Sequence, residues 1–152
     1  MKRYITIDGG TTNTRIRLIE NGTAMDEIKL KAGAGKRNSS LLAEAVKSGI
    51  DDIMKKSNLT EADITAILAA GMITSEFGIY CVPHICVPAG IPELNNGIKS
   101  VVINDITDMA INFIPGVKKQ GETLEQNDMM RGEECEFFGI SKLLNAENGS
   151  LV

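Results

Sequence analysis

The sequence predicts an α/β protein with a mixed β-sheet that opens with three antiparallel strands and is flanked by helices. Apolar and polar residues alternate over residues 4–8 and 15–19, which is the two-residue period of half-buried strands. Asn21-Gly22 then predicts a tight hairpin into a third strand, because both residue types accept the left-handed backbone of a type I′ turn. Beyond this hairpin, segments with helical spacing alternate with apolar runs, an order typical of α/β proteins.

A loop and a helix follow the predicted hairpin. Residues 32–40, AGAGKRNSS, form a glycine-rich loop without the full phosphate-loop pattern, since Arg37 stands where that pattern requires Ser or Thr. Asn38, Ser39 or Ser40 is a suitable N-cap for the next helix. Residues 41–56 predict that helix, because apolar side chains recur there at helical spacing. These side chains are Leu42, Val46, Ile50, Ile53 and Met54.

The rest of the chain contains short apolar runs and one further helix. The expected elements are a short helical start at 60–63, a buried strand at 64–71, a turn or short helix at 72–78, and strands at 98–106 and 110–116. Residues 130–145 predict a helix. Its core-facing residues are expected to be Phe137, Phe138, Ile140, Leu143 and Leu144.

Composition and charge argue against several classes of function. The chain has 152 residues, enough for one ordinary domain, and its net charge of −4 does not favour a basic face for nucleic acid or a membrane surface. No apolar run approaches the ~20 residues of a membrane-spanning helix, and the N-terminus has no signal-peptide pattern, so we expect a cytoplasmic protein. No G-x-G-x-x-G pattern follows a predicted strand, which argues against NAD or FAD.

The cysteines and the histidine do not predict a metal site. Cys81, Cys86 and Cys135 are best interpreted as reduced, mostly buried thiols of a cytosolic protein. A zinc site made of Cys81, His84 and Cys86 would need a fourth ligand, and the spacing fits no zinc motif. Since His84 is the chain's one histidine, any Ser-His or Cys-His pair would depend on it alone.

Residues 8–14, DGGTTNT, form a tight turn between the first two predicted strands. A carboxylate at the end of a first strand, here Asp8, commonly holds a metal ion directly or through water. Glycines let the backbone approach a phosphate closely, and Thr11, Thr12 and Asn13 add donors around it. Asp, Gly and Asn also form ordinary turns. The order, a strand-terminal Asp followed by a run of Thr, favours a phosphate site over a plain turn.

Residues 7–19, IDGGTTNTRIRLI, resemble the first phosphate motif of the actin, hexokinase and heat-shock-chaperone ATPase superfamily. The predicted antiparallel strands and the helix after them are similar to the ribonuclease H-like half-domain of that superfamily. Three more segments, AAGMITSEFG (69–78), NFIPGV (112–117) and NDMMRGEECEFFG (127–139), resemble the 2-dehydro-3-deoxygalactonokinase family of sugar-acid kinases. Met-Arg-Gly-Glu-Glu is the most specific element, whereas Asp-Gly-Gly-Thr-Thr is shared by many kinases.

The resemblance implies ATP- and Mg²⁺-dependent phosphorylation of 2-dehydro-3-deoxy-D-galactonate in galactonate catabolism. It places Mg²⁺ at Asp8, through water. The residues implied around the β- and γ-phosphates are Gly10, Thr11, Thr12 and Asn13. Arg15 then contacts a phosphate or the substrate carboxylate, or is an ordinary exposed strand residue. The alternatives are a kinase for another sugar or acetamido-sugar, and a non-catalytic half-domain that binds a partner.

The resemblance also suggests catalytic and substrate-binding residues in the second half of the chain. Asp128 is the implied base, since an Asn-Asp pair before a helix supplies it in hexokinase-like relatives, and Glu133 or Glu134 is the second choice. The alternatives are an N-cap role for Asp128 and a helix-dipole role for the glutamates. Arg131 is also implied to be a catalytic residue. It either binds the substrate carboxylate or forms a structural ion pair. The implied lining of the sugar-acid pocket is Met72, Thr74, Ser75, Arg131 and Glu134. Core packing is an equal alternative for Met72.

Family members are about twice as long as this chain, as expected of large chains that split into domains. The resemblance therefore implies that residues 1–147 form an N-terminal actin-like ATPase domain. Residues 148–152 would begin a truncated second domain that supplies the adenosine site. The implied partners are that C-terminal ATPase domain, a small sugar acid, and a second copy of the chain in a homo-oligomer. We expect activity of an enzyme with both halves rather than of this chain alone.

Overall fold

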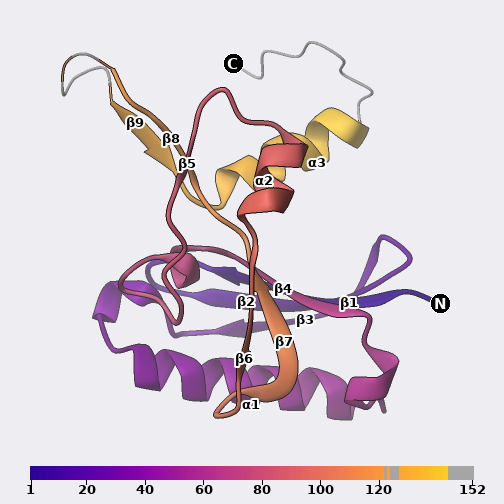
Figure 1. Ribbon diagram of the computed structural model, residues 1–152. Helices are drawn as coiled ribbons and strands as arrows, with labels where there is room; N and C mark the ends of the chain where they lie inside the picture. Colours follow the sequence, from indigo (N-terminus) through magenta and orange to yellow (C-terminus); the bar gives the residue numbers. More distant parts are fainter. Residues whose placement is uncertain (122, 124–126, 144–152) are drawn as a thin grey trace.

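A computed structural model describes residues 1–121, 123 and 127–143, with only the backbone described over 140–143. Figure 1 shows a large sheet with a long helix, α1 (Ser39–Lys56), on one side and a smaller group of strands and helices on the other. The large sheet has the strand order β3-β2-β1-β4-β7-β6. Its strands are β1 (Arg3–Gly9), β2 (Thr14–Glu20), β3 (Thr23–Leu30), β4 (Ala66–Gly71), β6 (Lys99–Ile103) and β7 (Thr107–Phe113).

The strand pairing confirms the predicted mixed sheet. β2 pairs antiparallel with both β1 and β3, so antiparallel strands open the sheet. β4 lies parallel to β1 and to β7, and β6 returns antiparallel to β7 at the edge. The predicted hairpin is also confirmed, with φ of 48° at Asn21 and 87° at Gly22. The carboxyl ends of β1 and β4 meet at one edge of the sheet, where Gly9 is the register partner of Gly71.

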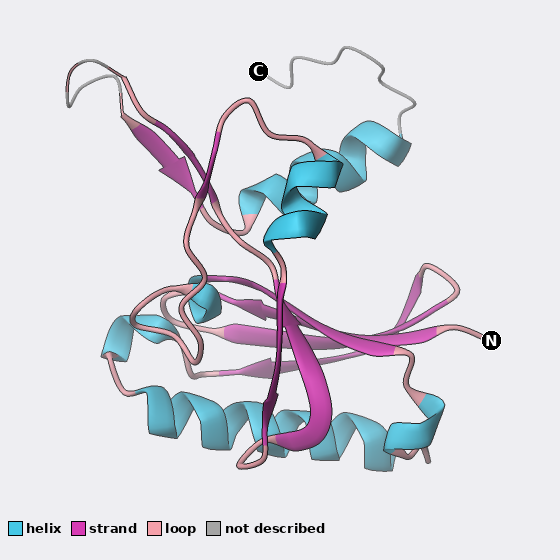
Figure 2. Cartoon of the chain, viewed as in Figure 1, coloured by secondary structure: helices cyan, strands magenta, loops and turns pink. Residues whose placement is uncertain are grey.

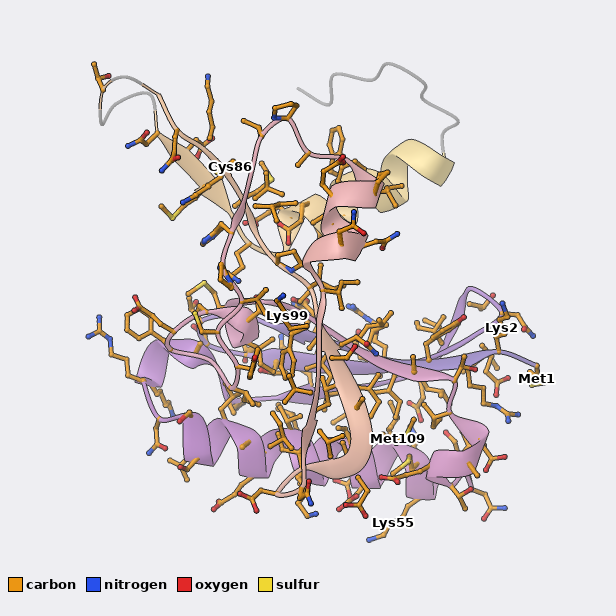
Figure 3. All side chains as sticks on the ribbon, in the orientation of Figure 1. Met1, Lys2, Lys55, Cys86, Lys99 and Met109 are labelled. Atoms are coloured by element: carbon orange, nitrogen blue, oxygen red, sulfur yellow. The ribbon has the colours of Figure 1, made fainter. Side chains whose placement is uncertain are left out.

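Helix α1 covers one face of this sheet and closes the core. Asn38 is the N-cap among the expected choices, because its side chain accepts a hydrogen bond from Leu41 N–H at 3.1 Å. Four of the predicted apolar residues are buried, Leu42, Val46, Ile50 and Ile53, while Met54 is partly buried. A Cβ on Gly49 would lie 2.6 Å from Ile16 Cδ1, so this glycine lets the helix approach β2 closely. Figure 3 shows side chains crowding the layer between α1 and the sheet.

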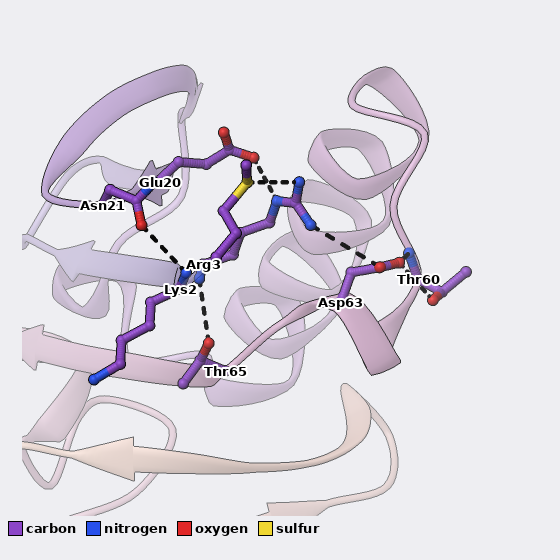
Figure 4. A network of polar contacts seen from close by, with 8 residues as sticks. Lys2, Arg3, Glu20, Asn21, Thr60, Asp63 and Thr65 are labelled. Carbon is purple, nitrogen blue, oxygen red and sulfur yellow. Dashed lines mark hydrogen bonds and ion pairs between the residues drawn. The ribbon is translucent and has the colours of Figure 1, made fainter.

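Polar contacts fasten the amino end of β1 (Figure 4). Arg3 pairs with Glu20 at the end of β2, and its Nη1 lies 4.0 Å from Asp63 Oδ1 in the short helix η2 (Glu61–Asp63). Arg3 N–H donates to Thr65 Oγ1 at 3.2 Å. These contacts tie β1 to β2 and to the segment before β4. They lie at the end of β1 opposite the β1–β2 turn, so they are separate from the candidate site described below.

The smaller group lies on the side of the main sheet opposite α1 (Figures 1 and 2). It contains a second sheet in the order β5-β8-β9, in which β5 and β8 are parallel and β8 and β9 antiparallel. Its elements are β5 (Ile85–Cys86), α2 (Ile91–Gly97), β8 (Val117–Lys119), β9 (Asp128–Met130) and α3 (Glu133–Leu143). Two further short helices, η1 (Ala34–Lys36) and η3 (Met72–Thr74), flank the β1–β2 turn and the end of β4.

Element predictions were less accurate in this half. The strand expected at 110–116 is observed as β7, which ends at Phe113, and β8, β9 and α2 were not predicted. The helix expected from residue 130 begins at Glu133, because Gly132 has a φ of 114° that an α-helix cannot contain. In the part of the chain that the structure describes, no helix has the length and apolar character needed to cross a membrane.

Side-chain burial also departs from expectation at several positions. Phe137 was expected in the core but is 37% exposed. The side chains of Ile140 and Leu143, the whole of Leu144, and residues 148–152 lie outside the described part of the chain. The prediction of mostly buried thiols was wrong for Cys81 and Cys86, which are exposed on the loop and strand leading away from the main sheet.

Candidate functional site

The β1–β2 turn presents hydrogen-bond donors at the edge of the sheet. Gly10 N–H donates to Asn13 O at 2.9 Å, which leaves Thr11 and Thr12 as the exposed tip. Within the described residues, no acceptor is found for the backbone N–H groups of Thr11 and Thr12. Unpaired backbone N–H groups in a tight turn are suited to binding an anion.

Asp8 and Arg15 face each other across β1 and β2 beside this tip. Asp8 Oδ2 lies 3.2 Å from Arg15 Nη1, and each side chain is 44% exposed. An exposed pair of this kind contributes less than about 1 kcal/mol to stability, so either partner can exchange it for a bound ion. Carboxylate oxygen and free access suit Mg²⁺ held through water. The residues present therefore fit a magnesium–phosphate group.

Glycines bring the Met-Arg-Gly-Glu-Glu segment against the end of β4. Gly71 has a φ of 85°, and a Cβ on it would lie 2.6 Å from the carbonyl oxygen of Gly9. Gly132 has a φ of 114°, and a Cβ on it would lie 3.2 Å from the Gly71 Cα. A side chain at Gly71 would collide with the backbone of Gly9, and one at Gly132 would crowd the end of β4. The Met-Arg-Gly-Glu-Glu segment therefore lies beside the carboxyl ends of β1 and β4, next to the β1–β2 turn.

Arg131 fastens this segment to the chain that follows β4. Its Nη1 donates to the carbonyl oxygen and to Oγ1 of Thr74, at 2.7 and 2.6 Å. Its Nη2 donates to Val82 O at 2.9 Å and lies 3.0 Å from His84 Nδ1. Burial lowers the pKa of Arg131. The alternative of a structural ion pair is wrong within the described residues, because the hydrogen-bond partners of Arg131 are neutral and no ion pair with it is found there. Binding of a substrate carboxylate by Arg131 stays a prediction, and the Nη groups would have to break these bonds to clasp it.

His84 and Thr74 support Arg131 in a way that the sequence did not indicate. The pKa of His84 is lowered by burial and then by the positive charges of Arg131 and Lys118, so its Nδ1 is available as an acceptor. Thr74 is fully buried, and its Oγ1 donates to Gly71 O at 3.0 Å. Contacts between residues this far apart in the chain leave no local pattern, so the sequence distinguishes His84 only as the one histidine of the chain.

The two glutamates at the start of α3 have different surroundings. Glu134 is 2% exposed, both its carboxylate oxygens lie 2.8 Å from Gly132 N, and burial raises its pKa. Glu133 is exposed and accepts a hydrogen bond from Arg131 N–H at 3.1 Å. Burial, together with the charges of Glu134 and Asp8, raises the pKa of the Cys135 thiol to about 12.

Asp128 lies in a different element from the one expected. It is exposed in β9, opposite Lys119, and its Oδ1 accepts from Met129 N–H at 2.8 Å. Since α3 begins at Glu133, the proposed N-cap role of Asp128 is wrong. Asp128 stands at the end of β9 farther from Gly132, so the structure does not bring it to the glycine contact.

The other predicted pocket residues, Met72, Thr74 and Ser75, belong to η3 and the residue that follows it. Thr74 is enclosed, so its hydroxyl reaches no open space. Ser75 is partly exposed, and its Oγ donates to Met72 O at 2.7 Å and accepts from Phe77 N–H at 3.2 Å. Met72 is partly exposed and also packs against the core, so both of its expected roles fit. Lining of a sugar-acid pocket by Met72 and Ser75 stays a prediction, whereas the buried Thr74 holds Arg131.

Comparisons with known proteins agree with this arrangement. Residues 8–152 match the model of the 2-keto-3-deoxy-galactonokinase family. A curated relative, 2-dehydro-3-deoxygalactonokinase of Escherichia coli (strain K12), is 28% identical over 141 residues, which are 93% of this chain and 43% of the relative. A solved protein from Sinorhizobium meliloti, described as a candidate 2-dehydro-3-deoxygalactonokinase, has a TM-score of 0.70 at 22% identity, again over 93% of this chain and 43% of its own.

These matches confirm the resemblance found in the sequence. The family match includes both the β1–β2 turn and the Met-Arg-Gly-Glu-Glu segment. The structural likeness independently supports the fold. The chain spans less than half the length of the relative and of the solved protein. It belongs to the 2-keto-3-deoxy-galactonokinase family.

Proposed function

We propose that this chain is the N-terminal half of a Mg²⁺- and ATP-dependent kinase that phosphorylates 2-dehydro-3-deoxy-D-galactonate. The observation that carries the proposal is the contact of Gly132 with Gly71, which sets a sugar-acid-kinase segment beside a phosphate turn. Coverage of 43% of both similar proteins supports a second domain that completes the nucleotide site. The domain boundary near residue 147, the cytoplasmic location and the homo-oligomer stay predictions.

We also assign the main sheet to the ribonuclease H-like half-domain of actin-like ATPases. Support comes from its topology, in which three antiparallel strands lead through α1 to a parallel β4 beside β1. This order places the β1–β2 turn at the carboxyl ends of the parallel strands. Ligands of open α/β sheets commonly bind at that edge.

The residues of the turn match the needs of phosphoryl transfer, which depends mainly on positioning and charge neutralisation. Mg²⁺, when bound, would neutralise charge on the phosphate oxygens. Asp8 would hold it through water, and Arg15 would be released toward a phosphate. The N–H groups of Thr11 and Thr12 would orient the terminal phosphates, with Gly10 and Asn13 closing the turn behind them.

We place the catalytic base at Glu133. A base must be exposed to reach the substrate hydroxyl, and it must adjoin the phosphate turn. Asp128 is exposed but stands at the remote end of β9, and Glu134 adjoins the site but is buried and bonded to Gly132. Glu133 meets both conditions, because it is exposed and directly follows Gly132. Glu134 then has the task of holding Gly132 in place.

The sugar acid would lie between η3 and the start of α3. Met72 and Ser75 would border it on one side and Glu133 on the other. The positive charge of Arg131 would attract the substrate carboxylate while its Nη groups stay bonded to the protein. This arrangement requires no metal ligand beyond those of the phosphate turn.

An assay of substrate preference tests the proposal. An enzyme with both halves is given MgATP and, in turn, 2-dehydro-3-deoxy-D-galactonate, its C4 epimer, and an N-acetylated hexose, and ADP release is followed. We expect kcat/KM to be highest for the galactonate. Phosphorylation of the acetamido-sugar in preference to both sugar acids would assign the chain to another kinase function.

A further inference from the structure

We propose that residues 33–37, the glycine-rich loop segment around η1, position the β1–β2 turn, here called the phosphate turn. The same segment connects this turn to residues 75–77 after η3, which are here called the sugar-side loop. The functional consequence rests on the proposed kinase activity, whereas the contacts themselves do not. The segment lacks a complete phosphate-loop pattern, so direct phosphate binding does not explain its glycines.

Two backbone hydrogen bonds join this segment to the tip of the turn. Ala34 N–H donates to Gly10 O at 3.1 Å, and Gly35 N–H donates to Thr11 O at 2.8 Å. A trans peptide unit is planar, so its N–H points opposite to its C=O. Holding the carbonyls of Gly10 and Thr11 against η1 therefore turns the N–H groups of Thr11 and Thr12 away from it. These are the same N–H groups that have no acceptor in the described part of the chain.

The glycines of the segment are required by the closeness of this contact. A Cβ on Gly33 would lie 2.5 Å from Thr11 O and 2.6 Å from Thr12 N. A Cβ on Gly35 would lie 2.7 Å from Thr11 O. The obstacles are backbone atoms, which cannot rotate away as a flexible side chain would. An alanine at either position must therefore displace the peptide units that carry the donors.

Arg37 extends the segment toward the sugar side. Its guanidinium carbon lies 4.4 Å from the centre of the Phe77 ring, a distance typical of a cation–π contact. Phe77 N–H in turn donates to Ser75 Oγ. A continuous set of contacts thus runs from Thr11 through Gly35 and Arg37 to Phe77 and Ser75. A loop that only connected β3 to α1 would need neither the two hydrogen bonds to the β1–β2 turn nor the contact of Arg37 with Phe77.

The first test uses nuclear magnetic resonance on the ligand-free chain, followed by titration with Mg²⁺–tripolyphosphate. We expect Gly33→Ala to shift the amide signals of Thr11 and Thr12 and to weaken tripolyphosphate binding by about tenfold, since small displacements of positioned groups have large effects. Gly139→Ala is the matched control, because no described atom lies within 4 Å of its Cβ position. Unchanged Thr11 and Thr12 signals in Gly33→Ala would overturn the positioning role.

The second test follows the connection to the sugar side. In the wild-type chain, Mg²⁺–tripolyphosphate should shift the signals of Thr11 and Thr12 and also those of Phe77 and Ser75. In Arg37→Gln the second pair should stop responding while the first pair still does, and Arg37→Lys should restore part of the response. A full response of Ser75 in Arg37→Gln would overturn the connection, even where Gly33→Ala fails to fold. If tripolyphosphate does not shift the Thr11 and Thr12 signals of the wild-type chain, the result would count against the kinase proposal. The positioning role would still be decided by the amide signals of the ligand-free Gly33→Ala chain.

Discussion

Gly132 lies directly against Gly71, so that a Cβ on Gly132 would come within 3.2 Å of the Gly71 Cα. Gly71 in turn pairs with Gly9, the residue after Asp8. The contact brings the Met-Arg-Gly-Glu-Glu segment beside the strand end from which the β1–β2 turn begins. The position of α3, and of the glutamates at its start, therefore depends on both glycines.

Gly132→Ala should destabilise the chain. A residue with a side chain is strained at a φ of 114°, at a typical penalty of about 1–3 kcal/mol, and the added Cβ also meets Gly71. Urea denaturation should show a fall of that size in the free energy of unfolding. Gly139→Ala, inside helix α3, should instead gain up to about 1 kcal/mol, since alanine is the better helix former. Equal stability of the two variants would contradict the glycine contact.

Asp8→Asn should leave stability nearly unchanged and reduce turnover. Its exposed pair with Arg15 contributes less than about 1 kcal/mol, whereas loss of the magnesium-positioning carboxylate acts on the transition state. In an enzyme with both halves, kcat should fall far more than the KM for the sugar acid rises. Glu27→Gln breaks another exposed pair on the same sheet, that with Arg17, and should change neither constant. An effect of Asp8→Asn confined to the sugar KM would show loss of uniform binding only, and would remove Asp8 from the magnesium site.

Acidification should loosen the Arg131 contacts through His84. Because the pKa of His84 is lowered from its ordinary 6.5, the unfolded chain binds this proton more readily than the folded chain. The contribution of His84 to stability is thus present above pH 6.5 and is lost as the pH falls through the lowered pKa. The charged groups acting on His84 are Arg131 and Lys118.

His84→Asn isolates this effect, because the asparagine carbonyl can accept from Arg131 in place of Nδ1. Denaturation at pH 7 and pH 5 should show that wild type loses more stability than His84→Asn on acidification. Glu134 has a raised pKa and an opposite pH dependence, in which stability is lost as the pH rises above its ordinary 4.5. Glu134 is present in both proteins, so its effect cancels in the comparison. Identical pH dependences would exclude His84 as the sensitive group.

Local patterns account for the elements that the sequence predicted well. The Asn21-Gly22 hairpin and helix α1 depend on residues close together in the chain, and both were confirmed. The strands of the second sheet have two or three residues each and are held by partners far away, so no period could indicate them. Arg131 was identified as important from its motif, but its neutral partners come from distant segments. The resemblance to a kinase family therefore indicated which segments form the candidate site, whereas the partners of each side chain could be found only from the structure.

Association of the chain should involve the face that holds α3. Phe137 on α3 is 37% exposed and Met129 on β9 is 68% exposed, and apolar surface left uncovered promotes association. Light scattering at high concentration should show dimers or larger species, and Phe137→Glu should shift the chain toward monomer. Met25→Glu changes another exposed apolar side chain, 58% exposed on strand β3 of the main sheet, and should not. A monomeric wild type at high concentration, or equal effects of both variants, would contradict this prediction.

Turnover of 2-dehydro-3-deoxy-D-galactonate by a Glu133→Gln enzyme with both halves tests the proposed site most directly. A general base contributes typically ~10²–10⁴ in rate, and glutamine keeps an oxygen for the bond from Arg131 N–H. We predict a loss of at least ~10²-fold in kcat with an almost unchanged melting temperature. Asp128→Asn should stay close to wild type in both measurements. Near-normal turnover in Glu133→Gln, with a large loss in Asp128→Asn, would contradict the assignment and return the base to β9.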